Sequence, residues 1–423
     1  MRILYIHQYF NTRLGSSGTR SYEFARALIQ AGHDVTMVCA STGGSVTGLT
    51  GAFGADRRAG IVDGIEVVEF RVGYSNHDPI FVRAAKFLKF AWRCTLEVFS
   101  RDFDLVVATS TPLTVVVPGA IARLVRRKPF VFEVRDLWPE LPIAMGLKNP
   151  FAIYGMRFLE WIGYRTATRL VALAPGIAEG IAKSGVPAER IELIPNGCDF
   201  DLFEAAAMRP ASRFPDRINP DDLVAIFAGA HGKANGLDAV LDAATELRRL
   251  GKASIKILLI GDGSEKARLQ ERVRNEGLAN VVLSPPVPKT ELASLLRGSD
   301  VALQVLADVP AFYNGTSPNK FFDYLAARRP VLINYPGWLA NLVTQARSGF
   351  VVAPGDATAF ARALVHAAEM RAELPTMGER AAELGKTSFD RGDLSKAFVS
   401  CVVRAHRDAR GSVRVDTDRA LQP

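Results

Sequence analysis

Short apolar runs alternate with amphipathic stretches along most of the chain. In the first half, runs with the length and composition of buried strands cover residues 3–6, 35–39, 65–71, 105–109, 130–134, 170–173 and 191–194. Stretches with apolar residues at helical spacing lie between most of them, for example residues 19–30 and 177–183. This alternation is typical of parallel sheets that helices cover on both faces.

The alternation stops after residue 195 and later begins again. Asn196-Gly197 indicates a turn, and Pro210, Pro215 and Pro220 interrupt a polar stretch. Further strand-like runs then cover residues 224–227, 255–260, 281–283, 301–305, 331–333 and 350–352. We therefore predict an α/β chain with two doubly wound, Rossmann-like domains at residues 1–200 and 223–390, and a linker at 201–222. A cleft is expected at the carboxyl ends of both sheets, and a disordered tail at residues 411–423.

Composition narrows the function classes only partly. The chain has 423 residues, enough for two domains, and its 48% hydrophobic and 23% charged residues are typical of a globular protein. No apolar run reaches the roughly 20 residues of a membrane span. The four cysteines are scattered without metal-ligand spacing, which predicts buried, reduced thiols in a cytosolic protein. A net charge of +8 favours an anionic partner, such as nucleic acid, acidic lipid or a phosphorylated substrate.

The segment from Asn314 to Asn334 indicates a nucleotide site. A polar loop leads into a short helix, which begins near Ser317 and Asn319, and an apolar strand follows. Lys320 and Asp323 lie three residues apart and therefore share a helix face, which we expect to point toward the loop. A carboxylate can accept hydrogen bonds from ribose hydroxyls, and an ammonium near a helix N-terminus suits phosphate. An ordinary amphipathic helix with solvated charges is the alternative.

Two other loops are candidates for phosphate binding. After the strand at residues 224–227, Gly229 and Gly232 would let the backbone approach a pyrophosphate, and Lys233 supplies a mobile charge. A generic glycine-rich turn explains this loop equally well. Near the N-terminus, Gly15-Ser-Ser-Gly18 is not a GxGxxG motif, and no acidic residue closes a second strand, so a dehydrogenase is disfavoured.

The run Ser-Pro-Asn-Lys320 with Asp323 resembles the donor-binding segment of glycosyltransferase family 4, whose members have the two-domain GT-B fold. The resemblance covers nearly the whole chain and includes residues 132–139 and the first loop. In the commonest form of the family two glutamates are separated by seven residues, and the second binds ribose. Asp323 occupies the second position, whereas Gly315 occupies the first, so the first acid is absent. This variant is similar to members from bacterial surface-polysaccharide pathways.

The resemblance implies further site residues. Lys233 would neutralise the leaving diphosphate, and Gly18 and Arg20 would face the donor phosphates. Arg135-Asp136 stands where many members carry His-Asp. Asp136 would orient or deprotonate the acceptor hydroxyl, and Arg135 would bind phosphate.

A structural pair among Glu133, Arg135 and Asp136 is the alternative interpretation of that segment, and His7 is interpreted as structural. The resemblance also implies that the two domains face each other, and that a helix at about residues 392–408 packs back on the first domain.

A basic stripe suggests a membrane surface. Arg83, Lys86, Lys89 and Arg93 recur at helical spacing among aromatic residues, with no acid between residues 80 and 96. Such a helix is typical of interfacial binding to anionic lipid, although a core-facing helix with a solvated basic face fits equally well. No recognisable nucleic-acid module is present.

Together with the resemblance, these features predict a retaining glycosyltransferase of bacterial surface-polysaccharide synthesis, for example of O-antigen or capsule. It would move a sugar, expected to be an N-acetylamino sugar, from a UDP-sugar to a polyprenyl-diphosphate-linked acceptor. No metal or other cofactor is expected, and the predicted location is cytoplasmic, peripheral on the inner face of the plasma membrane. A UDP-sugar epimerase of the same fold and a non-catalytic membrane-associated partner are the alternatives.

Overall fold

The computed structural model describes residues 1–15, 18–42, 45–74, 78–207 and 214–419, which form two compact units. The first unit comprises Met1–Pro195, Gly315–Ser317 and Gly392–Pro423, and the second comprises Asn196–Asn314 and Pro318–Arg391. The main crossings of the chain between units therefore fall after Pro195 and after Arg391.

The second unit begins earlier than the sequence predicted. Helix α7 (Phe200–Ala207) lies in the segment expected to be a linker, but it belongs to the second unit. Leu202 and Phe203 of this helix are buried, and the helix packs against α10 (Lys289–Gly298). Burial of two large apolar side chains explains why this segment is part of a domain. Residues 208–213 of the expected linker lie outside the described residues.

The first unit is built on an eight-stranded sheet with the order β3-β4-β2-β1-β5-β6-β7-β8. All neighbouring strands pair in parallel except β3 and β4, which are antiparallel. The strands are β1 (Arg2–Ile6), β2 (Asp34–Thr42), β3 (Arg57–Val62), β4 (Ile65–Tyr74), β5 (Leu105–Thr109), β6 (Phe130–Val134), β7 (Arg169–Ala172) and β8 (Ile191–Leu193). The hydrophobic pattern did not predict β3, because this edge strand alternates exposed and half-buried positions.

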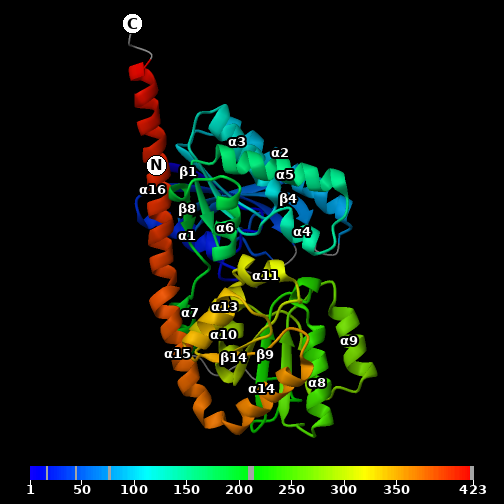
Figure 1. Ribbon diagram of the computed structural model, residues 1–423. Helices are drawn as coiled ribbons and strands as arrows, with labels where there is room; N and C mark the ends of the chain where they lie inside the picture. Colours follow the sequence, from blue (N-terminus) through cyan, green and yellow to red (C-terminus); the bar gives the residue numbers. More distant parts are fainter. Residues whose placement is uncertain (16–17, 43–44, 75–77, 208–213, 420–423) are drawn as a thin grey trace. The chain divides into compact units, whose positions relative to one another are not determined.

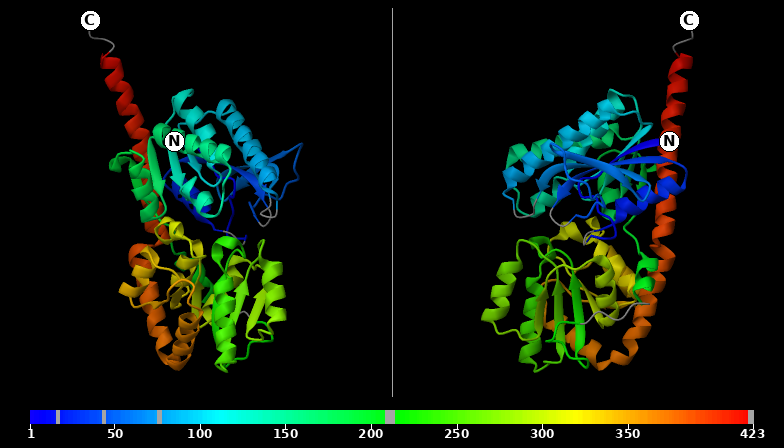
Figure 2. Two further views of the ribbon diagram at one scale, coloured as in Figure 1. Left: turned by 45° about the vertical axis from the view of Figure 1, so that its right-hand side comes forward. Right: turned by 180° about the vertical axis from the view of Figure 1, so that it is seen from behind.

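Helices cover the first sheet in Figures 1 and 2. They are α1 (Arg20–Gln30), α2 (Ile80–Ser100), α3 (Val116–Leu124), α4 (Glu140–Ala144), α5 (Pro150–Thr166) and α6 (Pro175–Lys183). Helices α2 and α5 both pack against α3, so the three lie side by side. At the start of α5, Pro150 occupies the first turn and Asn149 caps the helix by accepting a 3.1 Å hydrogen bond from the Ala152 amide.

The C-terminal helix α16 (Arg391–Arg419), red in Figure 1, packs on the first unit from Gly392 onward. The Phe398 ring stacks on Phe24, with 4.3 Å between ring centroids. An ion pair of 2.7 Å joins Arg404 to Glu192 beside β8. The helix continues past Gly411, where the sequence predicted a disordered tail, and no proline interrupts it before Pro423.

The second unit has a six-stranded parallel sheet with the order β11-β10-β9-β12-β13-β14. Its strands are β9 (Leu223–Ala228), β10 (Ile255–Ile260), β11 (Val281–Ser284), β12 (Val301–Gln304), β13 (Val331–Ile333) and β14 (Gly349–Val351). The other helices are α8 (Asp238–Arg249), α9 (Lys266–Asn275), α11 (Pro310–Gly315), α12 (Asn319–Ala326), α13 (Trp338–Gln345), α14 (Ala357–Glu369) and α15 (Leu374–Ser388). The predicted α/β class with two parallel-sheet domains is confirmed.

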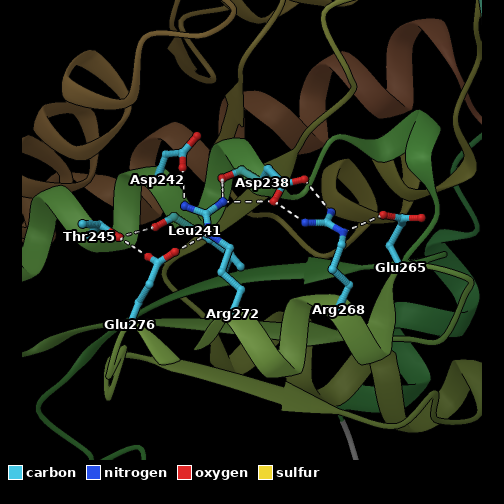
Figure 3. A network of polar contacts seen from close by, with 8 residues as sticks. All are labelled: Asp238, Leu241, Asp242, Thr245, Glu265, Arg268, Arg272 and Glu276. Atoms are coloured by element: carbon cyan, nitrogen blue, oxygen red, sulfur yellow. Dashed lines mark hydrogen bonds and ion pairs between the residues drawn. The ribbon is translucent and has the colours of Figure 1, made fainter. Parts of the chain in front are cut away.

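A network of ion pairs joins α8 to α9 (Figure 3). Arg268 contacts Asp238 at 2.6 Å and Glu265 at 2.8 Å, and Arg272 contacts both Asp238 and Glu276. Isolated surface pairs contribute about 0–1 kcal/mol each, and networks contribute more. Because Asp238 begins α8, the network holds the start of this helix, and with it the end of the preceding glycine loop.

Both sheets have a point where the strand order changes direction. In the first sheet β1 lies between β2 and β5, and in the second β9 lies between β10 and β12. Ligands of open α/β sheets bind at the carboxyl ends of the strands beside such points. The loops after β1, β5 and β6, and those after β9 and β12, are therefore the places to look for function.

Candidate functional site

The loop after β9 forms a glycine cradle (residues 229–236). Gly236 has a φ of 56°, and a Cβ there would lie 2.7 Å from the Ala307 backbone, so glycine is required. The His231 amide donates to the Asp262 carbonyl at 2.8 Å, and the His231 carbonyl accepts from the Glu265 amide at 2.9 Å. The loop is thus held on the carboxyl end of β9, where backbone groups can approach a bound phosphate.

Lys320 brings an ammonium group to the glycine cradle. Its Nζ hydrogen-bonds to Asn235 Oδ1 of the cradle and lies 4.2 Å from the centroid of the Phe227 ring. Helix α12 is fixed one turn after Lys320, at Tyr324. The Tyr324 hydroxyl accepts a hydrogen bond from the Ala228 amide at 3.1 Å and donates one to the Leu303 carbonyl at 3.2 Å. Tyr324 thereby anchors α12 to β9 and β12, which places Lys320 against the loop.

Burial lowers the pKa of Lys320 to about 7. Lys233, which the family resemblance assigned to the leaving diphosphate, is exposed. Gly229 and Gly232 are half-buried in the same cradle. The cation that the structure holds against the loop is therefore Lys320.

Asp323 has a different partner from Lys320. Its Oδ1 lies 3.1 Å from Nζ of Lys289 at the start of α10, and the residue is 8% exposed. Burial raises the pKa of the Asp323 carboxyl, and Lys289 opposes that shift. The expectation that Lys320 and Asp323 both point toward the preceding loop is therefore wrong, because Lys320 contacts the glycine cradle and Asp323 contacts α10. Ser317 and Asn319 are half-buried on either side of Pro318, where α12 begins.

Sequence reasoning missed Lys289. This lysine shares a buried helical stripe with Ala293 and Leu296, at spacings of four and three residues. A cation on an otherwise apolar stripe must find a partner in the folded protein, and that spacing was the available signal. This spacing does not predict which residues are the partners of Lys289, namely Asp199 and Asp323.

In the first unit, the ends of β1, β5 and β6 bring His7, Ser110, Thr111, Arg135 and Asp136 together. His7 Nδ1 lies 2.7 Å from Ser21 Oγ, and its Nε2 lies 3.3 Å from an Arg135 guanidinium nitrogen. Since the guanidinium can only donate, Nε2 accepts and Nδ1 donates to Ser21. Burial, followed by Arg135, holds the pKa of His7 well below its usual range, so the ring is neutral. These contacts agree with a structural histidine that also orients Arg135.

Asp136 lies half-buried at the end of β6. Its Oδ2 accepts a 3.1 Å hydrogen bond from Thr111 Oγ1, and the Arg135 amide donates to Ser110 Oγ at 3.0 Å. Burial raises the pKa of Asp136, while Arg135 opposes the shift. The carboxylate is held by one hydroxyl and retains further acceptor capacity.

The structure contradicts the assignment of Arg20 to the donor phosphates. Arg20 is 1% exposed, and its Nε donates to Glu133 Oε1 at 2.7 Å. The same guanidinium donates to the Ile194 carbonyl at 2.7 Å and lies 4.4 Å from the Phe24 ring centroid. Arg20 therefore neutralises the buried Glu133 carboxylate, which removes Glu133 from the alternative pair with Arg135. Gly18 lies just before α1, and residues 16–17 of that loop lie outside the described residues.

The basic residues of α2 are largely bound to the protein itself. Lys86 pairs with Asp78 at 2.8 Å, Arg93 pairs with Asp56, and Lys89 donates to the Arg71 carbonyl at 3.1 Å. Arg83 is half-buried. Two of the four cations of the stripe are thus paired with acids from other segments, whereas Lys89 is exposed and keeps its charge, so less of the stripe is free for lipid than the sequence predicted.

The helices beside α3 expose apolar side chains instead. On α2, Phe81 is 80% exposed and Trp92 is 62% exposed, and on α5, Phe151 is 86% exposed and Phe158 is 60% exposed. We define the apolar surface as Phe81, Leu88, Trp92, Leu96 and Phe99 of α2 with Phe151, Tyr154, Phe158 and Trp161 of α5. The α5 aromatics recur at spacings of three, four and three residues, so the sequence itself indicates that they share one helix face. None of the helices within the described ranges combines the length and hydrophobicity of a membrane span.

Comparisons with protein families agree with the division into two units. Residues 15–197 match the model of a glycosyl transferase 4-like domain, and residues 208–384 match that of glycosyl transferases group 1. D-inositol 3-phosphate glycosyltransferase 2 of Catenulispora acidiphila is 30% identical over 227 residues, which cover 51% of this chain and 52% of that protein. The putative colanic acid biosynthesis glycosyl transferase WcaI of Escherichia coli is 25% identical over 247 residues, covering 57% of this chain and 58% of that protein. The chain thus spans about half the length of the curated relatives it matches.

Solved structures show the same fold. Sucrose-phosphate synthase of Thermosynechococcus elongatus superimposes with a TM-score of 0.71 at 17% identity, covering 93% of this chain and 96% of that one. HepE of Anabaena, solved in complex with UDP and glucose, gives a TM-score of 0.67 at 17% identity and covers 94% and 98% of the two chains.

Proposed function

Because the chain belongs to the family 4 glycosyltransferases of the GT-B type, we propose that it transfers a sugar from a UDP-sugar to a lipid-linked acceptor. The observation that carries the proposal is the position of Lys320 in the second unit. Its ammonium is held against the glycine cradle by a neutral amide, so its charge is available for an anion. Asp323, one turn along the same helix, supplies an acceptor for ribose hydroxyls.

The proposed reaction exchanges one bond to the anomeric carbon. The bond between C1 of the donor sugar and the diphosphate oxygen breaks, and a bond from C1 to the acceptor hydroxyl oxygen forms on the same face, so configuration is retained. The departing diphosphate oxygen takes the acceptor proton. Lys320 and the amides of the glycine cradle stabilise the charge that develops on the diphosphate. The reaction uses no metal or cofactor beyond the UDP-sugar.

Asp136 is the proposed group for the acceptor. Its carboxylate, held by Thr111, would orient the reacting hydroxyl. Arg135, which His7 orients, would bind an acceptor phosphate. These roles rest on the family resemblance together with the unused acceptor capacity of Asp136.

A polyprenyl diphosphate is the acceptor class that best fits the apolar surface of the first unit. Aromatic side chains of this kind favour the interface between water and lipid. We therefore propose that the protein binds peripherally to the cytoplasmic face of the plasma membrane through the apolar surface. The likeness to WcaI, named for colanic acid biosynthesis, supports a role in bacterial surface-polysaccharide synthesis. An N-acetylamino sugar remains the proposed donor sugar from the family resemblance.

Substitution of Lys320 tests the donor site. Calorimetric titration with UDP is expected to show at least about tenfold weaker binding for Lys320→Met, because a charge-assisted hydrogen bond contributes roughly 1.5–3 kcal/mol. Lys233→Met is the matched control, since it removes the same charge from an exposed position of the same loop. Its UDP affinity should stay within about threefold of the parental value.

Equal UDP affinity in both variants would reject the assignment of Lys320. Binding of GDP in place of UDP would change the donor class. A parental protein that binds neither would favour the non-catalytic partner. Epimerisation at a sugar carbon of the UDP-sugar, in the absence of any acceptor, would favour the epimerase.

A further inference from the structure

Four charged side chains form a buried cluster in the second unit, which we call the Lys289 cluster. Lys289 Nζ lies 2.9 Å from Asp199 Oδ2 and 3.1 Å from Asp323 Oδ1, and Arg391 Nε lies 2.8 Å from Asp199 Oδ1. Each of these residues is at most 8% exposed. Two acids and two bases balance one another, as buried charges require.

Lys289 is the member that contacts both acids. Burial lowers the pKa of its ammonium, but Asp199 and Asp323 outweigh this effect and hold the pKa above its usual range, so Lys289 stays charged. Its bond to Asp323 Oδ1 fixes the direction of that carboxylate, while 12% of the Asp323 side chain remains exposed. A carboxylate fixed in this way loses less conformational freedom when it binds a pair of hydroxyls.

Asp199 and Arg391 lie where the chain passes between units. Asp199 follows the crossing at Pro195 by four residues, and Arg391 is the last residue before the return crossing. The two crossings are also bonded to each other, because Arg391 donates to the Gly197 carbonyl at 2.7 Å and the Cys198 amide donates to the Phe389 carbonyl at 2.8 Å. Lys289 connects these segments to α12.

We propose that Lys289 is a positioning residue that orients Asp323 toward the donor ribose and couples ribose recognition to the two crossing segments. The inference rests on the proposed function, since it requires Asp323 to bind the ribose of a nucleotide donor. Asp199 acts through Lys289, so its removal also disturbs ribose recognition although it does not touch Asp323.

The test compares UDP with 2′,3′-dideoxyuridine 5′-diphosphate by calorimetry. The ratio of the two affinities is the ribose discrimination, which the parental protein should show at about tenfold or more, because a charged acceptor binds the hydroxyls. Lys289→Met should reduce this ratio to within about twofold, and Lys289→Arg, which keeps the charge, should restore most of it.

Two controls separate positioning from stability. Leu247→Ala removes a fully buried core side chain of α8 and lowers the thermal midpoint, but it should leave the parental ratio. Arg371→Met breaks an ion pair of 2.9 Å with Asp300, which precedes β12 at the opposite end of the sheet, and should also leave the ratio unchanged.

The doubly substituted protein Lys289→Met/Asp199→Asn keeps the test decisive if the single variant does not fold, because it leaves Arg391 and Asp323 as a charge-balanced pair. A parental ratio in the folded double variant, or in Lys289→Met, would overturn the inference. The inference would also be overturned if the parental protein bound UDP and the dideoxy analogue with equal affinity. A parental protein that binds no UDP would instead reject the proposed function.

Discussion

Two lysines of the second unit show how the immediate surroundings set the role of a side chain. Lys289 lies between the carboxylates of Asp199 and Asp323, which hold its pKa well above the usual range. Lys320 contacts a neutral amide and the face of the Phe227 ring, and burial lowers its pKa to about 7. The first lysine is neutralised within the protein. The second gains stabilisation when an anion arrives, which is the property that a diphosphate site needs.

The lowered pKa of Lys320 predicts a pH-dependent affinity for UDP. The diphosphate favours the ammonium form and raises its pKa in the complex. Affinity should therefore be full below pH 7 and should decrease as pH rises through about 7, by at most about tenfold per pH unit. Above pH 7 the charge on UDP is nearly constant, because its last ionisation has a pKa of about 6.

Calorimetry at pH 7.0, 8.0 and 9.0 measures this dependence. The control is Lys320→Arg, whose guanidinium stays charged and should bind UDP with little change over this range. Parental affinity that stays constant between pH 7 and 9 would show that Lys320 is already fully protonated or does not contact the diphosphate.

The role proposed for Asp136 predicts that its substitution slows sugar transfer without weakening UDP binding. Asp136→Asn removes the charge but preserves the shape, and it should reduce the rate of sugar transfer at least about a hundredfold, because the carboxylate is proposed to orient the acceptor hydroxyl. UDP affinity should remain within about twofold, because the proposed nucleotide contacts lie in the second unit. Transfer from radiolabelled UDP-sugar to a lipid-linked acceptor is the measurement, and a parental rate in this variant would remove Asp136 from the mechanism.

At the scale of elements, α2 shows that a charge pattern in the sequence does not reveal which charges are paired in the fold. The basic residues of α2 share a helical stripe, but Asp56 and Asp78 meet two of them from other segments. These side chains thereby contact the protein, and most of the exposed positions of α2 are aromatic or aliphatic, although Lys89 is exposed as well. The membrane contact that we propose for this region therefore depends on apolar burial more than on a free cationic face.

The apolar surface predicts how substitutions change membrane binding. Phe158→Glu/Trp161→Glu should weaken binding to vesicles that contain phosphatidylglycerol by at least about tenfold, because burial of one large apolar side chain contributes roughly 1.5–3 kcal/mol. Co-sedimentation at matched protein concentration is the measurement. Leu250→Glu, at an exposed leucine in the second unit, is the control and should behave like the parental protein. Unchanged co-sedimentation of the α5 variant would reject the apolar surface as the membrane contact.

At the scale of the whole molecule, two parallel sheets and the crossings between them organise the chain. The first crossing lies between Pro195 and Asn196, and the second lies at the start of α16. After the second crossing, Phe398 and Arg404 attach α16 to the first unit. The first unit is therefore assembled from both ends of the chain, and the Lys289 cluster lies in the second unit beside both crossings.

The sequence by itself determined the α/β class, the two sets of parallel strands, the family, and the short helix that carries Lys320 and Asp323. Hydrophobic periodicity and local motifs depend on neighbouring residues, so they can be recognised without a structure. Only the tertiary structure decided which charges meet. Arg20 pairs with Glu133 at a separation of 113 residues, and Lys289 pairs with Asp199 at a separation of 90. A sequence pattern indicates which face of an element a side chain occupies, whereas its partner depends on which distant segment packs against that face.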